Sequence, residues 1–161
     1  IDPIDGTTNF LHGIPHFAIS IALKIKNNII SGLIFDPIKN EIFYAEKNSG
    51  SFFNNQRIRV SKKNDLEDCL FATNHLGAKY SELNLRYTGC AALDLAYVGS
   101  GRLDGFFQND INIWDIAAGA IIVEEAGGQV NDISKFKINN INIRASSTNI
   151  HSKLLEKLNN F

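Results

Sequence analysis

The sequence has 161 residues, of which 44% are hydrophobic and 20% charged, and its formal net charge is −1. A chain of this length builds one domain, or two small halves that share an interface, around a real hydrophobic core. The near-neutral charge disfavours direct nucleic-acid binding, and no apolar run reaches the roughly 18 residues of a membrane span, so neither a nucleic-acid partner nor a membrane is expected.

The first half of the sequence predicts an antiparallel meander. Residues 17–26 alternate branched apolar side chains with small or polar ones, as a half-buried strand does, and residues 29–35 repeat the pattern. Residues 41–46 supply a third strand. Because the turns between these strands are short, neighbouring strands should pair antiparallel. Two further short strands are expected, one at an edge over residues 51–53 and one over residues 70–73.

The second half changes to a helical period. Residues 90–98 are apolar on almost every face and are followed by glycines, which predicts a buried helix. Residues 105–108 predict a short strand. Residues 114–126 predict a second buried helix that ends at a pair of glycines. Residues 148–158 carry one apolar stripe and predict a surface helix that closes the domain.

This order of elements predicts a mixed α+β fold of the broad α/β class. Strands come first, and helices that alternate with strands follow, which indicates layered sheets and helices in two halves. We expect residues 1–69 to hold an acidic loop and the meander, and residues 70–161 to form a C-terminal α/β half.

Two features of the composition bear on the origin of the chain. It contains no methionine, so the sequence as written does not start at a translation initiation site, and we expect it to be the downstream piece of a longer protein. Its two cysteines, Cys69 and Cys90, form no disulfide or zinc pattern, and no secretory leader precedes them. We therefore expect both thiols to be reduced in a cytoplasmic protein.

The opening residues place two carboxylates three positions apart. Pro3 fixes one backbone angle and Gly6 relaxes another, so Asp2 and Asp5 can be turned toward a common point. Two like charges about 4 Å apart repel by roughly 4 kcal/mol at an effective dielectric constant of about 20, and a bound divalent cation would reverse this repulsion. Oxygen ligands without histidine or cysteine favour magnesium, manganese or calcium over zinc. A capped surface turn is the alternative for this spacing alone.

Asp2 and Asp5 are accompanied by groups that can bind an anion and by a third acid. Gly6, Thr7 and Thr8 offer amides and hydroxyls that can hold a phosphate if the threonines begin a helical turn. Carboxylates for metals beside amides for an anion are what phosphoryl transfer needs. Asp115 follows Trp114 at the start of a buried helix. An aspartate there is usually a cap, but a buried helix is also a rigid mount for a metal ligand.

Two longer motifs resemble a known family. DPIDGTTNF at residues 2–10, together with WDIAAG at residues 114–119, resembles the paired signatures of the inositol monophosphatase family of magnesium-dependent, lithium-sensitive phosphatases. The similarity continues through TGCAALDLAYVGSGRLDGFF and EEAGGQV, and points to bacterial members. It implies a layered α-β-α-β-α sandwich of the sugar and inositol phosphatase type, with the N-terminal helical layer missing here, and a parent protein that is a homodimer.

The resemblance also implies roles for individual residues. Magnesium ligands are implied at Asp2, Ile4 (through its carbonyl oxygen), Asp5 and Asp115. Asp5 and Thr7 are implied as catalytic residues, with the Thr7 hydroxyl orienting a water that displaces the alcohol in line, without a phosphoenzyme. Contacts to phosphate or substrate are implied at Gly6, Thr7, Gly89, Cys90, Ala91, Gln108 and Asp115.

The sequence departs from the family pattern at three points. The upstream helical region that supplies a glutamate ligand is absent, so we expect weak metal binding and little or no turnover from this chain. Gln108 stands where many members carry a glutamate that contacts inositol hydroxyls, which leaves the substrate open, because an amide can bond a hydroxyl but brings no charge. The segment between Thr73 and Leu85 is short, which predicts thinner cover over the second half.

Magnesium-dependent hydrolysis of a small phosphate monoester, inositol monophosphate first, is the leading hypothesis. Sibling activities on histidinol phosphate or adenosine bisphosphate stay open. The alternative from another class is a non-catalytic module that binds a partner, since some bacterial relatives serve as accessory factors in transcription complexes.

Acidic residues on the two apolar helices need structural explanations. Asp94 falls inside an apolar helix, where an unpaired carboxylate is costly, so we expect a partner such as Arg86 or Arg102. The glutamates at residues 124–125 close a helix whose dipole they oppose, and nothing local explains them. Cys90 lacks a histidine placed to activate it, so we do not expect it to be a nucleophile.

Overall fold

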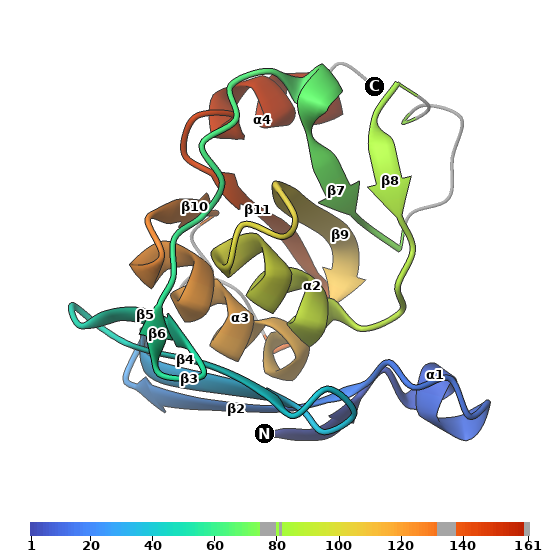
Figure 1. Ribbon diagram of the computed structural model, residues 1–161, viewed down its shortest axis with the longest axis vertical. Coiled ribbons are helices and arrows are strands. Elements are labelled where there is room, and N and C mark those ends of the chain that lie inside the picture. Colours follow the sequence, from blue (N-terminus) through green and yellow to red (C-terminus); the bar gives the residue numbers. More distant parts are fainter. Residues whose placement is uncertain (75–79, 81, 132–137, 160–161) are drawn as a thin grey trace.

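A computed structural model describes residues 1–74, 80, 82–131 and 138–159, and the statements below concern these residues. Figure 1 shows four layers, which are a sheet, the helices α2 and α3, a second sheet and the helix α4. The predicted mixed α+β fold of layered sheets and helices is confirmed. The expected thin cover between Thr73 and Leu85 falls largely outside the described residues.

The first sheet is a six-stranded antiparallel meander, with its strands in chain order. They are β1 (Asp2–Asp5), β2 (Ala18–Ile25), β3 (Asn28–Asp36), β4 (Glu41–Glu46), β5 (Gly50–Phe53) and β6 (Gln56–Arg57). The three predicted strands of the meander are confirmed as β2, β3 and β4. The prediction that residues 51–53 form an edge was wrong, because the two-residue strand β6 pairs beyond β5.

Alternation along β3 and β4 directs one face of this sheet onto the helices. Ile34 and Phe43 lie opposite each other in register and are fully buried. Gly32 marks the closest approach to α3 (Ile113–Glu125), since a Cβ atom there would lie 2.7 Å from the backbone of Ala118. The other face carries exposed apolar side chains, at Ile21, Leu23, Ile25 and Ile42.

The second sheet is mixed, in the order β10-β11-β9-β7-β8. Its strands are β7 (Leu70–Ala72), β8 (Asn84–Arg86), β9 (Gly105–Ile111), β10 (Gly128–Val130) and β11 (Ile141–Ser147). β7 pairs parallel with β8 and β9, and the remaining pairs are antiparallel. The predicted strands at residues 70–73 and 105–108 are confirmed, and β9 is longer than expected.

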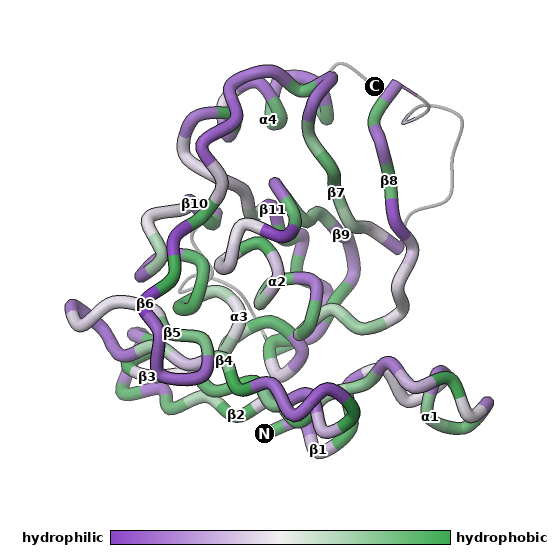
Figure 2. Tube along the Cα trace, viewed as in Figure 1, coloured by the Kyte–Doolittle hydropathy of each residue, from purple (hydrophilic) through white to green (hydrophobic). Residues whose placement is uncertain are grey.

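The buried helices are α2 (Ala91–Gly99) and α3, and both confirm the predictions. Figure 2 shows hydrophobic residues along much of their length, between the two sheets. α4 (His151–Asn159) packs against the opposite face of the second sheet, as its apolar stripe predicted. A short helix, α1 (Thr7–Leu11), and a 3-10 turn, η1 (Leu66–Asp68), complete the described elements. Among the residues that the structure describes, no helix combines the length and the apolar character that a membrane crossing requires.

The structure explains Glu125, one of the two glutamates that oppose the dipole of α3, and corrects the partner of Asp94. The Glu125 carboxylate accepts hydrogen bonds from the backbone amides of Asn48 (2.8 Å) and Gly50 (2.9 Å), so it anchors the β4–β5 turn. Asp94 accepts a hydrogen bond from the Thr88 hydroxyl at 2.8 Å. The predicted arginine partner was wrong, since Arg102 instead forms a bidentate ion pair with Glu41 of β4.

Candidate active site

A glycine turn connects the first strand to the first helix. β1 ends at Asp5, Gly6 adopts φ +86°, and α1 begins at Thr7. A Cβ atom at Gly6 would lie 3.0 Å from the carbonyl oxygen of His16 and 3.3 Å from Cβ of Cys90. The left-handed backbone and the close approach both require glycine here.

Three carboxylates meet where this turn faces the start of α3. Oxygens of Asp2, Asp5 and Asp115 all lie within 4.8 Å of one another. The structure thus brings together acids from β1 and α3 that are far apart in sequence. Asp5 is buried, and the other two are half-buried.

The carboxylates border a cavity of about 420 Å³. Its described lining residues are Asp2, Asp5, Gly6, Thr7, Thr8, Asn74, Gly89, Ala91, Gln108, Ile111, Asn112, Trp114 and Asp115. All predicted site residues are in this set except two. Ile4 uses its carbonyl oxygen to accept the Thr7 hydroxyl at 2.9 Å. Cys90 is fully buried behind Asp5, so its side chain does not face the cavity as predicted for a substrate contact.

Sequence reasoning missed two asparagine side chains that line this cavity, Asn112 and Asn74. Asn112 is the N-cap of α3 and forms a capping box with Asp115. The Asp115 carboxylate accepts a hydrogen bond from the backbone amide of Asn112 at 3.2 Å. The capping motif was visible in the sequence as an Asn three positions before an acid. Asn74 donates to Gln108 at 3.1 Å, and no local pattern marks that pairing.

Helix N-termini stabilise negative charge at two of the acids. The amide of Ala92, in the first turn of α2, donates to the Asp5 carboxylate at 2.6 Å, and the Cys90 thiol donates to the same oxygen at 3.1 Å. Asp115 occupies the first turn of α3. Because the N-terminal end of a helix carries partial positive charge, both ends also favour a phosphate nearby.

Crowding and burial nevertheless work against ionisation. Burial raises the pKa of Asp5 above its usual value, although the Ala92 and Cys90 hydrogen bonds lower it. Burial, followed by the nearby charge of Asp5, raises the pKa of Asp115 to about 7. The described lining residues include no lysine, arginine or histidine that would relieve this repulsion. Three crowded oxygen ligands without a protein counter-charge fit a hard divalent cation.

We expect cation binding to release protons at neutral pH. At a pKa of about 7, much of the metal-free protein carries a proton on Asp115 at pH 7, and ion binding requires the carboxylate form. The apparent affinity for Mg²⁺ should therefore rise between about pH 6 and pH 8. Calorimetric titration at pH 7 in two buffers of different ionisation enthalpy measures the released protons, and equal heats in both would contradict the expectation. Titration at pH 9 is the control, where the heats should coincide.

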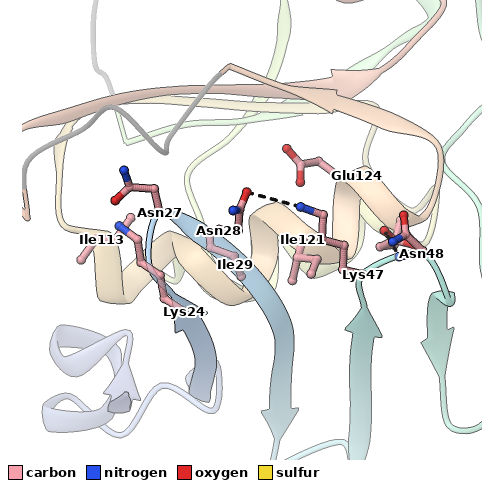
Figure 3. A pocket seen from close by; sticks show the side chains of 10 residues that line it. Lys24, Asn27, Asn28, Ile29, Lys47, Asn48, Ile113, Ile121 and Glu124 are labelled. Carbon is pink, nitrogen blue, oxygen red and sulfur yellow. Dashed lines mark hydrogen bonds between the residues drawn. The ribbon is translucent and has the colours of Figure 1, made fainter.

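A second cavity of about 260 Å³ runs along α3 beside the β2–β3 turn. Figure 3 shows side chains of both charges around it, among them Lys24, Lys47 and Glu124. Lys47 contacts the Asn28 side chain at 3.3 Å, and Glu125 already accepts two backbone amides. This cavity holds no acid cluster among the described residues, so the metal and phosphate chemistry points to the larger one.

The chain is similar to known proteins over almost its whole length. The sequence matches the profile of the inositol monophosphatase family over residues 1–160. It is 45% identical over 170 aligned positions to a fructose-1,6-bisphosphatase/inositol-1-monophosphatase of Thermotoga maritima, covering 99% of this chain and 66% of the relative. It is 39% identical over 175 aligned positions to the Nus factor SuhB of Haemophilus influenzae, covering 98% of this chain and 66% of the relative.

The structure is similar to that of an inositol monophosphatase from Anabaena, with a TM-score of 0.92 and 37% identity, covering 99% of this chain and 73% of the other. The chain spans between 55% and 66% of the length of the curated relatives it matches. The profile match over nearly every residue and the identity to these relatives agree with the fold. The chain belongs to the inositol monophosphatase family.

Proposed function

We propose that this chain carries the site of a magnesium-dependent phosphatase that hydrolyses inositol monophosphate with water. The observation that supports this most is the convergence of Asp2, Asp5 and Asp115 beside the Gly6–Thr7 turn in one cavity. Family membership supports phosphatase chemistry, and the oxygen-only ligand set supports magnesium. We further propose a cytoplasmic protein, whose parent is a homodimer, and inhibition by lithium.

The three carboxylates, with the Ile4 carbonyl, would hold the metal. When bound, magnesium would polarise the phosphate and lower the pKa of a bound water. The Thr7 hydroxyl donates to the Ile4 carbonyl at 2.9 Å, so its oxygen lone pairs are free to accept a hydrogen bond from the attacking water. In this proposal, Thr7 orients that water, and Asp5 is a ligand of the metal that would activate it.

The opposite wall would receive the alcohol half of the substrate. Gln108 accepts the Asn74 amide through Oε1, which leaves its own amide nitrogen to donate to a hydroxyl. Gly89 and Ala91 also line the cavity, and in this proposal they belong to the same wall. An amide that bonds a hydroxyl without adding charge is compatible with a polyol, and it leaves the choice among polyol phosphates to the assay below.

A panel of phosphate esters tests the proposal. Inositol 1-phosphate, fructose 1,6-bisphosphate, histidinol phosphate and adenosine bisphosphate are incubated with the chain, with magnesium or with a chelator, and phosphate release is measured. We expect slow magnesium-dependent release, fastest from inositol 1-phosphate, inhibited by lithium and lost in Asp5→Asn. Absence of magnesium-dependent release from every ester would contradict the proposal.

A second candidate is suggested by the name of the Haemophilus relative, Nus factor SuhB. We propose, as an alternative, that the chain binds a transcription complex independently of its acids. Pull-down from a cell lysate with the native chain and with Asp5→Ala tests this, because recovery of the same transcription proteins by both supports the alternative and recovery by neither contradicts it.

A further inference from the structure

Asn9 does not line the cavity, but its side chain connects segments next to the cavity. It lies in α1 and is buried, with 9% of its surface exposed. Its side-chain nitrogen donates to the carbonyl oxygens of His16 at 2.8 Å and Thr88 at 2.9 Å. Both amide hydrogens are therefore used, and both acceptors are backbone atoms of other segments.

The backbone next to Thr88 is fitted closely around this amide. Gly89 adopts φ +79°, and a Cβ atom there would lie 3.1 Å from Nδ2 of Asn9 and 3.3 Å from its Oδ1. The cavity wall at Gly89 thus lies directly against the Asn9 side chain. Asn9 itself follows Thr7 and Thr8 in the same short helix, and both threonines line the cavity.

We propose that Asn9 is a positioning residue, which sets the spacing between the phosphate-binding turn at residues 6–8 and the wall at residues 88–91 that contacts the alcohol half of the substrate. The inference rests on the proposed function. Inorganic phosphate needs only the turn and the metal, whereas a phosphate ester also needs the wall at the correct distance. Loss of Asn9 should therefore weaken binding of the ester far more than binding of phosphate.

Asn9→Leu removes both donors at similar volume. Asn84→Leu is the matched control, because the side-chain nitrogen of Asn84 also donates to two carbonyl oxygens, of Glu67 (3.0 Å) and Cys69 (3.3 Å). Asn84 lies in β8 and does not line the cavity. Because Asn84 is exposed and Asn9 is buried, Asn84→Leu should cost less stability, and the site should be altered only in Asn9→Leu.

The experiment measures dissociation constants of inorganic phosphate and inositol 1-phosphate by calorimetry with magnesium present. In Asn9→Leu, we expect the inositol 1-phosphate constant to rise at least about tenfold while the phosphate constant changes less than about twofold, since small misplacements of reacting groups have large effects. Asn84→Leu should leave both constants unchanged. Where turnover is measurable, KM for inositol 1-phosphate should rise more than that for a small aryl phosphate.

Equal weakening of both ligands, or no weakening of either, would overturn the positioning role. If Asn9→Leu does not fold, Asn9→Ser carries the same comparison, because serine removes both amide donors and leaves a smaller polar side chain, and a rise confined to the ester is expected. Failure of the wild-type chain to bind either ligand would instead count against the proposed function, so the two failures are distinguishable.

Discussion

An Asp115→Asn variant should lose most of its magnesium affinity while its metal-free form becomes harder to unfold. The amide keeps the oxygen that accepts the Asn112 hydrogen bond, so the cap of α3 survives. It removes one of three charged ligands, and we expect at least about a 100-fold loss of affinity, because even outer partners of a metal ligand account for 10-fold to 100-fold.

The gain in stability follows from the sign of the pKa shift. The folded protein raises the pKa of Asp115 to about 7, so folding favours the protonated acid, and ionisation destabilises the fold as pH rises from the usual range of an aspartate through 7. The variant should be more stable by roughly 1–2 kcal/mol at pH 8, less than the full shift implies, because water screens a half-exposed group. The difference should vanish below about pH 4.

Urea unfolding with a chelator at pH 4 and pH 8, with magnesium titration beside it, measures both effects. Asp110→Asn is the control, because this aspartate is exposed at the end of β9 and its backbone, at φ +54°, suits an asparagine. An Asp115→Asn protein that binds magnesium normally, or that is destabilised at pH 8, would contradict the view of a crowded ion site.

A Gly119→Ala variant should lose stability although alanine is the better helix former. In an exposed helix this exchange stabilises by about 1 kcal/mol. In α3 the new Cβ atom would overlap the Leu95 side chain of α2, approaching its Cδ1 to 2.6 Å. Both helices are buried between two sheets, so neither can move away freely. We expect a net loss of about 2–3 kcal/mol from overpacking.

Gly127→Ala separates this overlap from backbone effects. Gly127 has φ +87° and no atom within 4 Å of a built Cβ, so the exchange should cost only about 1–2 kcal/mol of backbone strain. Urea unfolding of both variants gives the comparison. A neutral or stabilising Gly119→Ala would contradict the close packing of the Gly119 backbone against the Leu95 side chain.

Local periodicity was sufficient for the meander and the helices. Alternation identified residues 17–26 and 29–35 as strands, and continuous apolar runs identified the two buried helices. The edge of the first sheet was misplaced because β6 has only two residues, too few for a period to show. β8 and β10, at three residues each, also escaped, because they lack the apolar run that marked β7 at the same length. The parallel pairing of β7 depends on contacts far apart in sequence.

The same contrast between local pattern and distant contact applies to the candidate site. Its acids were recognisable from two motifs, but the fold is what brings them together. Asp94 was expected to pair with an arginine, because charge suggests charge, but a hydroxyl six positions earlier in sequence is its partner. Cys90 was expected at the substrate from its place in a motif, yet a residue beside a cavity segment can face inward, and the thiol bonds Asp5 instead. The division of the chain at residues 69 and 70 stays a prediction.

The outward face of the meander governs the colloidal behaviour of the chain. Ile21, Leu23, Ile25 and Ile42 expose apolar surface on this face. The net charge of the chain is only −1, so electrostatic repulsion between molecules is weak. Sulfate salts strengthen apolar association and would drive such a chain toward salting out. Dispersion in dilute buffer away from the isoelectric pH of about 6.5 is therefore the favourable regime for handling it.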